Sequence, residues 1–497
     1  MDLWNNIALG MQVALSPEAL LYCFLGVTFG TFIGVLPGIG SLVAISLSLP
    51  LTYYLDPTIG LIMIAGIYYG GGYGGSTASI LLNLPGKASA AVTCLDGYPM
   101  AQQGRAGVAL IGTAYASFFG SVVGFLVLIL FSPVVSEAAI EFGPVEYFSL
   151  VTLGLITAAS MSTASTLKSV AMVLVGLMLS VVGTDVATGA PRFNFGMLEL
   201  RDSLSLVAVA MGLFGVAEVV RSINKEQRPE IHRNITFRNM WPSWQDIKQS
   251  IKPMIRGSGI GGFFGALPGT GMDVASFMAY ATEVRVAKDK SRFGKGAIEG
   301  IMAPEAANNA AALTAFVPTL TLGIPGDAVM ALVLGALMIH GINPGPLLMV
   351  QNPETFWGLA SSFIVGNALL LVLNIPLVGI WIKMLLIPYS ILYPFIIIFI
   401  CFGVFSTSNS PIDVILVAVI GAAGYVMYLL EFPTAPVLLG LVLGPMMEEN
   451  LRRGLIISRG DFMAFVESPI SAVLLALSAG ILIWSIRETL KRSKQHE

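Results

Sequence analysis

Polar and charged side chains recur inside residues 303–346, a stretch that is mostly apolar enough to lie in a membrane. The stretch is interrupted at Gly323-Ile324-Pro325-Gly326, and its polar residues include Glu305, Asn308, Asn309, Thr314, Thr319, Thr321 and Asp327. Ionisable and amide side chains are costly at membrane depth and usually mark a solute path. Broken helix is tolerated there only inside protein or beside a polar cavity. We therefore expect a helix unwound at its middle, whose freed backbone groups and side chains face a small ligand.

A weaker copy of this stretch lies upstream. Residues 69–87 (YGGGYGGSTASILLNLPGK) align with residues 309–327 (NAAALTAFVPTLTLGIPGD), and the Pro-Gly dipeptides coincide. A second pair of motifs precedes them, GVLPGIG at 34–40 and GALPGTG at 265–271. Two motifs in the same order in each half predict an internal duplication. Gly/Pro interruptions at corresponding places in two apolar halves are typical of a secondary transporter's binding site.

Composition places the chain in a membrane. Of its 497 residues, 55% are hydrophobic and 11% are charged, whereas soluble domains carry roughly 25% charged residues. The apolar segments are too long and too uniform for an outer-membrane barrel. They predict an all-α polytopic membrane protein of roughly 12 transmembrane helices in two inverted repeats, with re-entrant hairpins and broken helices.

The chain divides into four predicted parts: a first transmembrane repeat at 1–220, a basic linker at 221–256, a second repeat at 257–467, and a C-terminal helix with its tail at 468–497. Half of the 26 Lys and Arg residues lie between 221 and 295, and the last helix is also followed by basic residues. Short basic loops stay in the cytoplasm. We therefore expect the linker and the C-terminus inside. The first hairpin, which has no basic flank, should enter from the outer face.

The residues beside the breaks form the candidate binding site. Helix N-terminal amides favour carboxylates, and helix C-terminal carbonyls favour Na⁺. The candidate substrate-binding residues are Pro37, Gly38, Gly40, Ser41, Ser76, Thr77, Asn83, Pro85, Gly86, Lys87, Gly269, Thr270, Gly271, Asn308, Asn309, Thr321, Pro325 and Gly326. Oxygen ligands suit a hard cation, so Gly38, Asn83, Thr270, Asp273 and Asp327 are the candidate Na⁺ sites.

Several of these residues have a purely structural alternative. The Leu-Pro-Gly tips are also compatible with packing kinks, and Glu305 with Asn308 and Asn309 is compatible with interhelical hydrogen bonding. Lys87 and Asp327 occupy matching positions, one residue after each Pro-Gly. They are interpreted as facing charges in one cavity, as separate contacts in which Lys87 meets a substrate carboxylate and Asp327 a cation, or as residues past the helix ends in water. Tyr68 and Tyr69 are interpreted equally well as packing or interfacial residues.

At this point the sequence resembles the TctA family, the large membrane subunit of the tripartite tricarboxylate transporters. The likeness is carried by GVLPGIG (34–40), AGIYYGGGYGGSTASILLNLPG (65–86), LDGYPMAQQGRAG (95–107), VGTDVATGAPRFNFG (182–196), GALPGTG (265–271), RFGKGAIEGIMAPEAANNAAA (292–312) and LTLGIPGDA (320–328). It runs from about residue 20 to residue 490. Lys87 and Asp327 depart from the usual residues after each Pro-Gly, which bears on the substrate.

The resemblance implies a permease subunit that imports citrate-like tricarboxylates or related carboxylates across the bacterial inner membrane. It implies a coupling ion gradient, commonly Na⁺, a small four-helix membrane subunit (TctB-like) and a periplasmic solute-binding protein (TctC-like). The alternative is a stand-alone carboxylate permease or channel without a binding protein. The chain has no GxxxxGK[ST], GxSxG or HExxH motif, so an enzyme is not expected.

Overall fold

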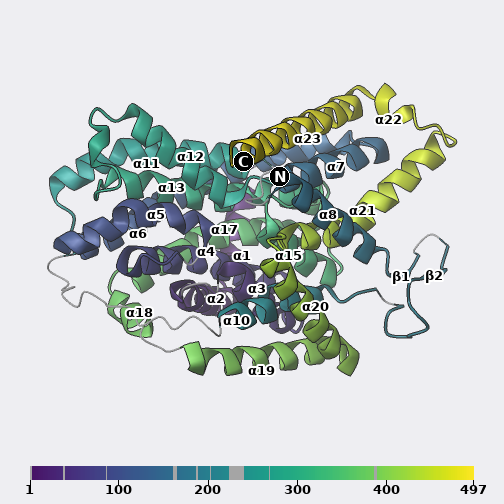
Figure 1. Ribbon diagram of the computed structural model, residues 1–497, viewed down its shortest axis with the longest axis horizontal. Coiled ribbons are helices and arrows are strands. Elements are labelled where there is room, and N and C mark those ends of the chain that lie inside the picture. Colours follow the sequence, from purple (N-terminus) through teal and green to yellow (C-terminus); the bar gives the residue numbers. More distant parts are fainter. Residues whose placement is uncertain are drawn as a thin grey trace.

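The computed structural model describes residues 3–36, 40–85, 87–160, 165–185, 188–201, 203–222, 240–267, 269–385 and 389–496. These residues are almost entirely helical (Figure 1). Within these ranges, six helical segments are long and apolar enough to cross a membrane, and four shorter apolar helices accompany them. The expected all-α membrane architecture is confirmed.

The first half begins with α1 (Leu3–Ala14) and a hairpin of α2 (Pro17–Val35) and α3 (Ser41–Thr52). A broken helix follows as α4 (Pro57–Leu82) and α5 (Ala88–Met100), which continues through η1 (Ala101–Arg105) into α6 (Ala106–Ile140). The half is completed by α7 (Pro144–Ser160), α8 (Thr166–Ser180), the ribbon β1 (Gly183–Thr184) and β2 (Pro191–Arg192), and the helical run α9 (Leu206–Ala210), η2 (Met211–Val216) and α10 (Ala217–Ser222).

The second half repeats this order. A hairpin of α11 (Trp244–Gly265) and α12 (Gly271–Val286) precedes η4 (Lys290–Arg292) and a broken helix of α13 (Glu299–Thr314), α14 (Phe316–Leu322) and α15 (Ala328–Ile339). The remaining helices are α16 (Leu348–Gln351), α17 (Pro353–Asn374), α18 (Val378–Met384), α19 (Tyr389–Ser408), α20 (Pro411–Leu429), α21 (Ala435–Ile457), α22 (Ala464–Glu467) and α23 (Pro469–His496). Helix α11 starts inside the basic segment 221–256, of which residues 223–239 lie outside the described ranges.

The two helix breaks have the same backbone geometry. Helix α4 ends at Asn83 and α14 at Gly323, both in the left-handed conformation (φ 55° and 71°) and both two residues before a proline. After each Pro-Gly, an extended residue forms the N-cap of the next helix: Lys87 (φ −150°) for α5 and Asp327 (φ −155°) for α15. A left-handed residue ends a helix, and the proline that follows cannot continue it.

Each hairpin is joined to the broken helix of its own half by backbone contacts at three small residues. A Cβ added at Gly26, Gly30 or Gly34 of α2 would lie within 2.5 Å of a carbonyl oxygen of α4, at Met63, Ile67 and Gly71 respectively. On α11 the corresponding glycines Gly257, Gly261 and Gly265 would meet the carbonyl oxygens of Ala303, Ala307 and Ala311 on α13 within 2.4 Å. Small residues at four-residue spacing allow such close helix approach in membranes.

Substituting one of these glycines is expected to destabilise the protein. A methyl group at position 261 would lie 2.1 Å from the Ala307 carbonyl oxygen, whereas position 259 on the same helix has nothing within 4 Å. Overpacking typically costs about 1–3 kcal/mol, while alanine is favoured over glycine in a helix by about 1 kcal/mol. Thermal unfolding in detergent should show Gly261→Ala destabilised and Gly259→Ala unchanged or slightly stabilised. Equal melting temperatures would contradict the packing argument.

The contacts also fix helix directions. Helix α2 runs parallel to α4, and α11 runs parallel to α13, because the residue numbers of the contacting positions rise in the same direction along both helices of each pair. Helices α4 and α13 are antiparallel, since Ser76 contacts Glu305 whereas Tyr68 lies against Phe316, the first residue of α14, just beyond the C-terminal end of α13. The two hairpins therefore point toward each other from opposite ends of the molecule.

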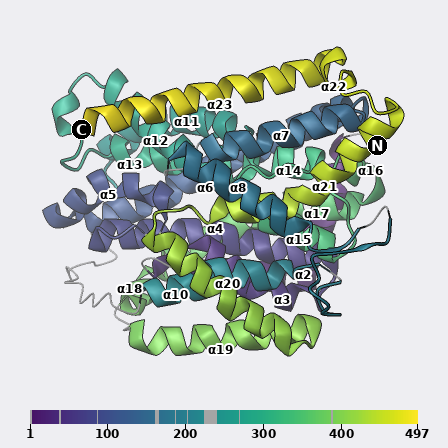
Figure 2. The ribbon, with the colours of Figure 1, turned by 45° about the vertical axis from the view of Figure 1, so that its right-hand side comes forward.

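The β1–β2 ribbon is held against the end of α21 by paired ions. Arg192 donates to both carboxylate oxygens of Glu448 (2.6 and 3.2 Å), and Arg452 donates to both oxygens of Asp185 (3.1 and 2.7 Å). The ribbon follows the end of α8, whereas the start of α8 contacts Ser485 of α23 through Thr166 (2.6 Å). The C-terminal part of α23, which runs along one side of the molecule in Figure 2, thus lies at the opposite end of α8 from the ribbon.

Candidate functional site

The antiparallel crossing of α4 and α13 brings the two helix breaks into one region. Both helices are buried over almost their whole length, and the crossing supplies Glu305, Asn308 and Asn309 from α13. Helices α5 and α15 begin at this crossing, and the tip of the second hairpin adjoins it. Polar groups from both halves are therefore assembled within an otherwise apolar core.

Lys87 and Asn308 form the first polar pair of the site. The Lys87 ammonium donates to Asn308 Oδ1 at 3.2 Å and lies 3.6 Å from the Met272 sulfur. It faces Gly72 of α4, where an added Cβ would lie 3.3 Å from Nζ. Asn308 is 1% exposed, and its Nδ2 donor has no hydrogen-bond partner among the residues that the structure describes. An ammonium ion and a free amide donor, both beside the N-terminus of α5, are the groups that a carboxylate would accept from.

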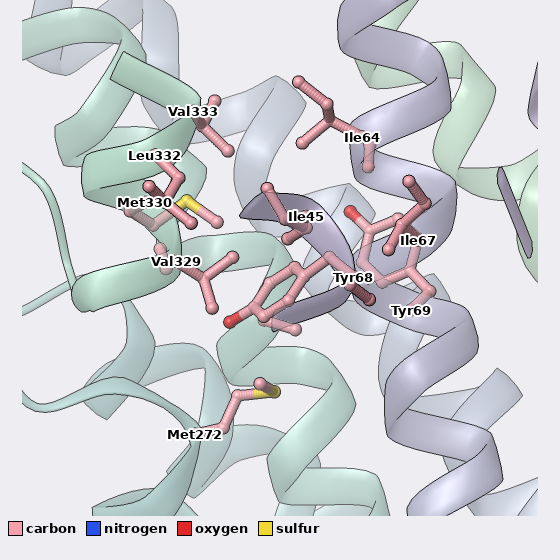
Figure 3. Close-up of a cluster of buried hydrophobic side chains, with 14 of the residues drawn as sticks. Ile45, Ile64, Ile67, Tyr68, Tyr69, Met272, Val329, Met330, Leu332 and Val333 are labelled. Atoms are coloured by element: carbon pink, nitrogen blue, oxygen red, sulfur yellow. The ribbon is translucent and has the colours of Figure 1, made fainter. Parts of the chain in front are cut away.

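Asp327 belongs to a second polar group at the other break. Its Oδ1 accepts from the Met330 amide at 2.9 Å and caps α15, while its Oδ2 accepts from the Tyr68 hydroxyl at 2.9 Å. Figure 3 shows Tyr68 reaching away from α4 toward Val329, with Met272 of α12 nearby. Gly271 packs directly on Asp327, since an added Cβ there would lie 3.1 Å from the Asp327 Cβ.

The hairpin tip is tied to this second break by its backbone. The Gly269 amide donates to the Gly326 carbonyl at 2.9 Å. Gly269 has φ 82°, and an added Cβ would lie 2.5 Å from the Ala158 nitrogen of α7. Only glycine fits this conformation and this close approach.

Lys87 and Asp327 do not pair directly. Among the described residues, no ion pair joins them, and each has partners of its own: Asn308 for Lys87, Tyr68 and the α15 N-terminus for Asp327. Both side chains are half-buried. Lys87 does interact electrostatically with three carboxylates, those of Glu305, Asp273 and Asp327.

Glu305 is the most enclosed carboxylate of the site, with no exposed surface. Ser76 and Thr93 donate to its Oε1 at 2.7 and 2.5 Å, and Ser117 donates to its Oε2 at 3.3 Å. The three hydroxyls come from α4, α5 and α6. Thr93 and Ser117 were not among the sequence candidates, because a lone hydroxyl in an apolar helix carries no recognisable spacing.

The remaining candidates are placed as follows. Gly40 (φ 39°) is the N-cap of α3, and Ser41 lies against Gly71. The hydroxyls of Thr270 and Thr321 donate to carbonyls of their own segments, and the Asn309 amide donates to the Glu305 carbonyl. Asn83, Pro85 and Asp273 are exposed, whereas Thr77 and Pro325 are buried. Pro37, Gly38 and Gly86 lie outside the described residues.

Asp96 is a buried carboxylate that sequence reasoning missed. Its Oδ1 accepts from the amides of Lys295, Gly296 and Ala297 (3.1, 2.9 and 2.8 Å), and its Oδ2 accepts from the Tyr280 hydroxyl at 3.0 Å. It therefore joins the segment 95–107 to the loop that follows the second hairpin. The sequence offered one indication of this contact, because the segment that contains Asp96 and the loop that it binds both belong to motifs that carry the family resemblance.

Replacing Asp96 by alanine is expected to reduce stability strongly. Hydrogen bonds to charged groups contribute about 1.5–3 kcal/mol each, and Asp96 is fully buried. Asp96→Ala should therefore lose at least about 3 kcal/mol of unfolding free energy and lower the amount of folded protein. Asp289→Ala is the matched control, because Asp289 caps the same loop but is exposed. Similar melting temperatures for the two variants would contradict the assignment.

Comparison with known proteins shows the family of the chain. Residues 20–439 match the model of the tripartite tricarboxylate transporter TctA family. The chain belongs to the TctA family. The resemblance drawn from the sequence motifs is confirmed, and the chain is a multi-pass membrane protein of a transporter family.

Two curated relatives come from Agrobacterium vitis. One, an uncharacterized 52.8 kDa protein in the TAR-I ttuC' 3'region, is 46% identical over 495 residues, covering 100% of this chain and 98% of the relative. The other, an uncharacterized protein in the TAR-II ttuC' 3'region, is 49% identical over 237 residues, covering 48% of this chain and 98% of the relative. No solved structure matches the chain.

Proposed function

We propose that this chain is the permease subunit of a tripartite transporter that imports a small di- or tricarboxylate across the bacterial inner membrane. Family membership supports a transporter component. The observation that carries the substrate class is the Lys87–Asn308 pair, which presents an ammonium and an unpartnered amide donor at a helix N-terminus. Partners of the TctB and TctC type follow from the tripartite family.

The site's chemistry explains why a carboxylate would bind there. The substrate carboxylate accepts from Lys87 Nζ and from Asn308 Nδ2, and the dipole of α5 favours its negative charge. Such charge-assisted hydrogen bonds are roughly twice as strong as neutral ones. The binding protein delivers the substrate, and the second carboxylate of the substrate contacts further groups of the breaks.

A coupling cation fits the charge balance of the site. Lys87 interacts electrostatically with the carboxyl groups of Glu305, Asp273 and Asp327, so an entering anion brings further negative charge close to acidic groups, and unbalanced charge is costly at membrane depth. We therefore propose uptake with Na⁺, for which the oxygens of Asn83, Thr270, Asp273 and Asp327 remain candidate ligands. A proton is the alternative coupling ion.

The proposed architecture is two inverted repeats. The antiparallel run of α4 and α13, the matching breaks and the matching glycine contacts support it. It predicts that Asp56, the N-cap of α4, lies outside and that Gln245, near the start of α11, lies inside. Cysteines introduced at these two positions should react with a membrane-impermeant thiol reagent from opposite faces. Labelling of both from the same face would contradict the arrangement.

The function is tested by reconstituting the chain in liposomes with its small membrane subunit and a periplasmic binding protein. Uptake of labelled carboxylates should require the binding protein and a Na⁺ gradient, and a panel of mono-, di- and tricarboxylates identifies the substrate. Equal uptake without the binding protein would favour the stand-alone permease instead. Absence of carboxylate uptake under every condition would contradict the proposal.

A further inference from the structure

A small cavity lies beside Glu305, between α4, α6 and α17. Its polar lining consists of Tyr73, Ser76, Thr77, Thr113, Ser117 and Asn374. Each of these side chains carries an oxygen atom, and none of them is charged. The cavity has room for roughly one occupant of the size of a water molecule.

The cavity and the Glu305 carboxylate share two side chains. Ser76 and Ser117 line the cavity, and both donate their hydroxyl protons to Glu305. Because the proton of each hydroxyl is committed to the carboxylate, the oxygen lone pairs remain available on the cavity side. The negative charge of Glu305 thus reaches the cavity through two polarised hydroxyl groups.

Glu305 lacks a direct counterion. It is fully buried, and no Lys, Arg or His of the described residues forms an ion pair with it within 4 Å. Lys87 interacts with it electrostatically but donates its hydrogen bond to Asn308. A buried carboxylate at membrane depth is costly without a compensating charge. A cation in the oxygen-lined space beside Glu305 would supply that compensating charge.

We propose that this cavity is a Na⁺ site, in which Ser76 and Ser117 coordinate the ion and Glu305 balances its charge. Oxygen ligands select hard cations over softer metals. Divalent ions are disfavoured, because Mg²⁺ and Ca²⁺ sites contain carboxylates among the direct ligands. The single carboxylate of Glu305 would also balance only one of the two charges of such an ion, whereas it balances the whole charge of Na⁺. The site is separate from the candidate Na⁺ ligands at the helix breaks.

The site deepens the proposed function, on which its role in coupling rests. Ser76 lies one helical turn after Gly72, the residue that faces the Lys87 ammonium. Glu305 lies one turn before Asn308 on α13. A Na⁺ ion in the cavity and a carboxylate on Lys87 and Asn308 would thus occupy adjacent turns of the same two helices. Each would offset the other's charge, and the effect on affinity must be reciprocal.

The site is tested by ²²Na⁺ binding to the purified full chain without substrate or binding protein. We expect saturable binding that excess unlabelled Na⁺ displaces and an equal concentration of K⁺ does not. Ser117→Ala should weaken Na⁺ affinity about ten-fold, the effect of losing one interaction of about 1.4 kcal/mol. Glu305→Gln should abolish the component of Na⁺ binding that Ser117→Ala weakens.

Ser121→Ala is the matched control. Ser121 lies one turn after Ser117 on α6, is equally buried, and donates to Asn367 at 2.8 Å, but it does not line the cavity. Its Na⁺ affinity should equal that of the unmodified chain. If Glu305→Gln does not fold, the Na⁺ affinities of Ser117→Ala and Thr113→Ala, compared with that of Ser121→Ala, still decide whether the cavity binds Na⁺.

Three results would each overturn the site. The first is a Na⁺ affinity that neither Ser117→Ala nor Glu305→Gln changes, and the second is an equal loss of affinity in Ser121→Ala. The third is displacement of ²²Na⁺ by K⁺ as effectively as by unlabelled Na⁺. Because the measurement contains no carboxylate, its failure is distinguishable from failure of the proposed transport function. Carboxylate uptake is judged separately in the liposome assay.

Discussion

Replacing Lys87 by methionine is expected to reduce carboxylate uptake about 100-fold or more. Truncating one partner of a buried, hydrogen-bonded charge pair typically costs about 2–5 kcal/mol. Lys87 is half-buried, so we take the lower part of this range, in which about 2.7 kcal/mol corresponds to 100-fold. Methionine fills similar space but leaves Asn308 Oδ1 without its 3.2 Å donor. Initial uptake rates at equal membrane abundance measure the effect. Lys168→Met is the control, since Lys168 is a peripheral lysine that donates to the Leu430 carbonyl.

The same variant, combined with Asp327→Asn, tests whether the two charged N-caps act together. The structure gives them separate partners, so the losses in uptake should largely multiply in the double variant. A double variant that recovers abundance or uptake relative to the single variants would show a direct charge pair, contrary to the geometry described here. Uptake by Lys87→Met at the unmodified rate would remove Lys87 from the site.

Replacing Gly269 by valine is expected to abolish uptake while the protein remains in the membrane. The new Cβ would lie 2.5 Å from the Ala158 nitrogen, in a backbone conformation (φ 82°) that side chains rarely adopt. The strain of such a conformation is about 1–3 kcal/mol. It is relieved only by moving the tip, which breaks the hydrogen bond from Gly269 to Gly326. Measurement of both quantities should therefore show uptake lost and membrane abundance retained.

Gly341→Val separates conformational strain from the close approach. Gly341 has φ 70°, but an added Cβ there would have nothing within 4 Å. Its variant should retain most uptake, whereas Gly269→Val should not. Normal uptake by Gly269→Val would reduce the hairpin tip to a packing feature.

The sequence predicted the helix breaks well because their signals are local. Proline and glycine interrupt apolar segments at 37–38, 85–86 and 325–326, and the described helices end and begin around these points. The duplication stays a prediction, which rests on motifs that recur in the same order in each half. Lys87 and Asn308 are candidates from the sequence because both polar residues stand out against an apolar background, and the structure places them in contact.

The partners of these residues were not predictable, because they depend on which helix faces which. The sequence leaves Lys87 as a partner of Asp327, a contact for a substrate carboxylate or a solvated residue, and it does not indicate Asn308, to which Lys87 donates in the structure. Tyr68, left undecided, contacts Asp327. Asp96 lies 199 residues from the first amide it binds. Contacts at such separation leave no periodic pattern in one sequence.

The glycine contacts between α11 and α13 have a consequence for suppressor genetics. A substitution at Gly257, Gly261 or Gly265 clashes with the carbonyl oxygens of Ala303, Ala307 and Ala311, and every amino acid carries a carbonyl oxygen. No second substitution at these alanines can remove the obstructing atom. A selection for restored growth after Gly261→Ala should therefore return reversion to glycine, or changes on other faces of α11 that let the whole helix shift, and no compensating change at Ala307.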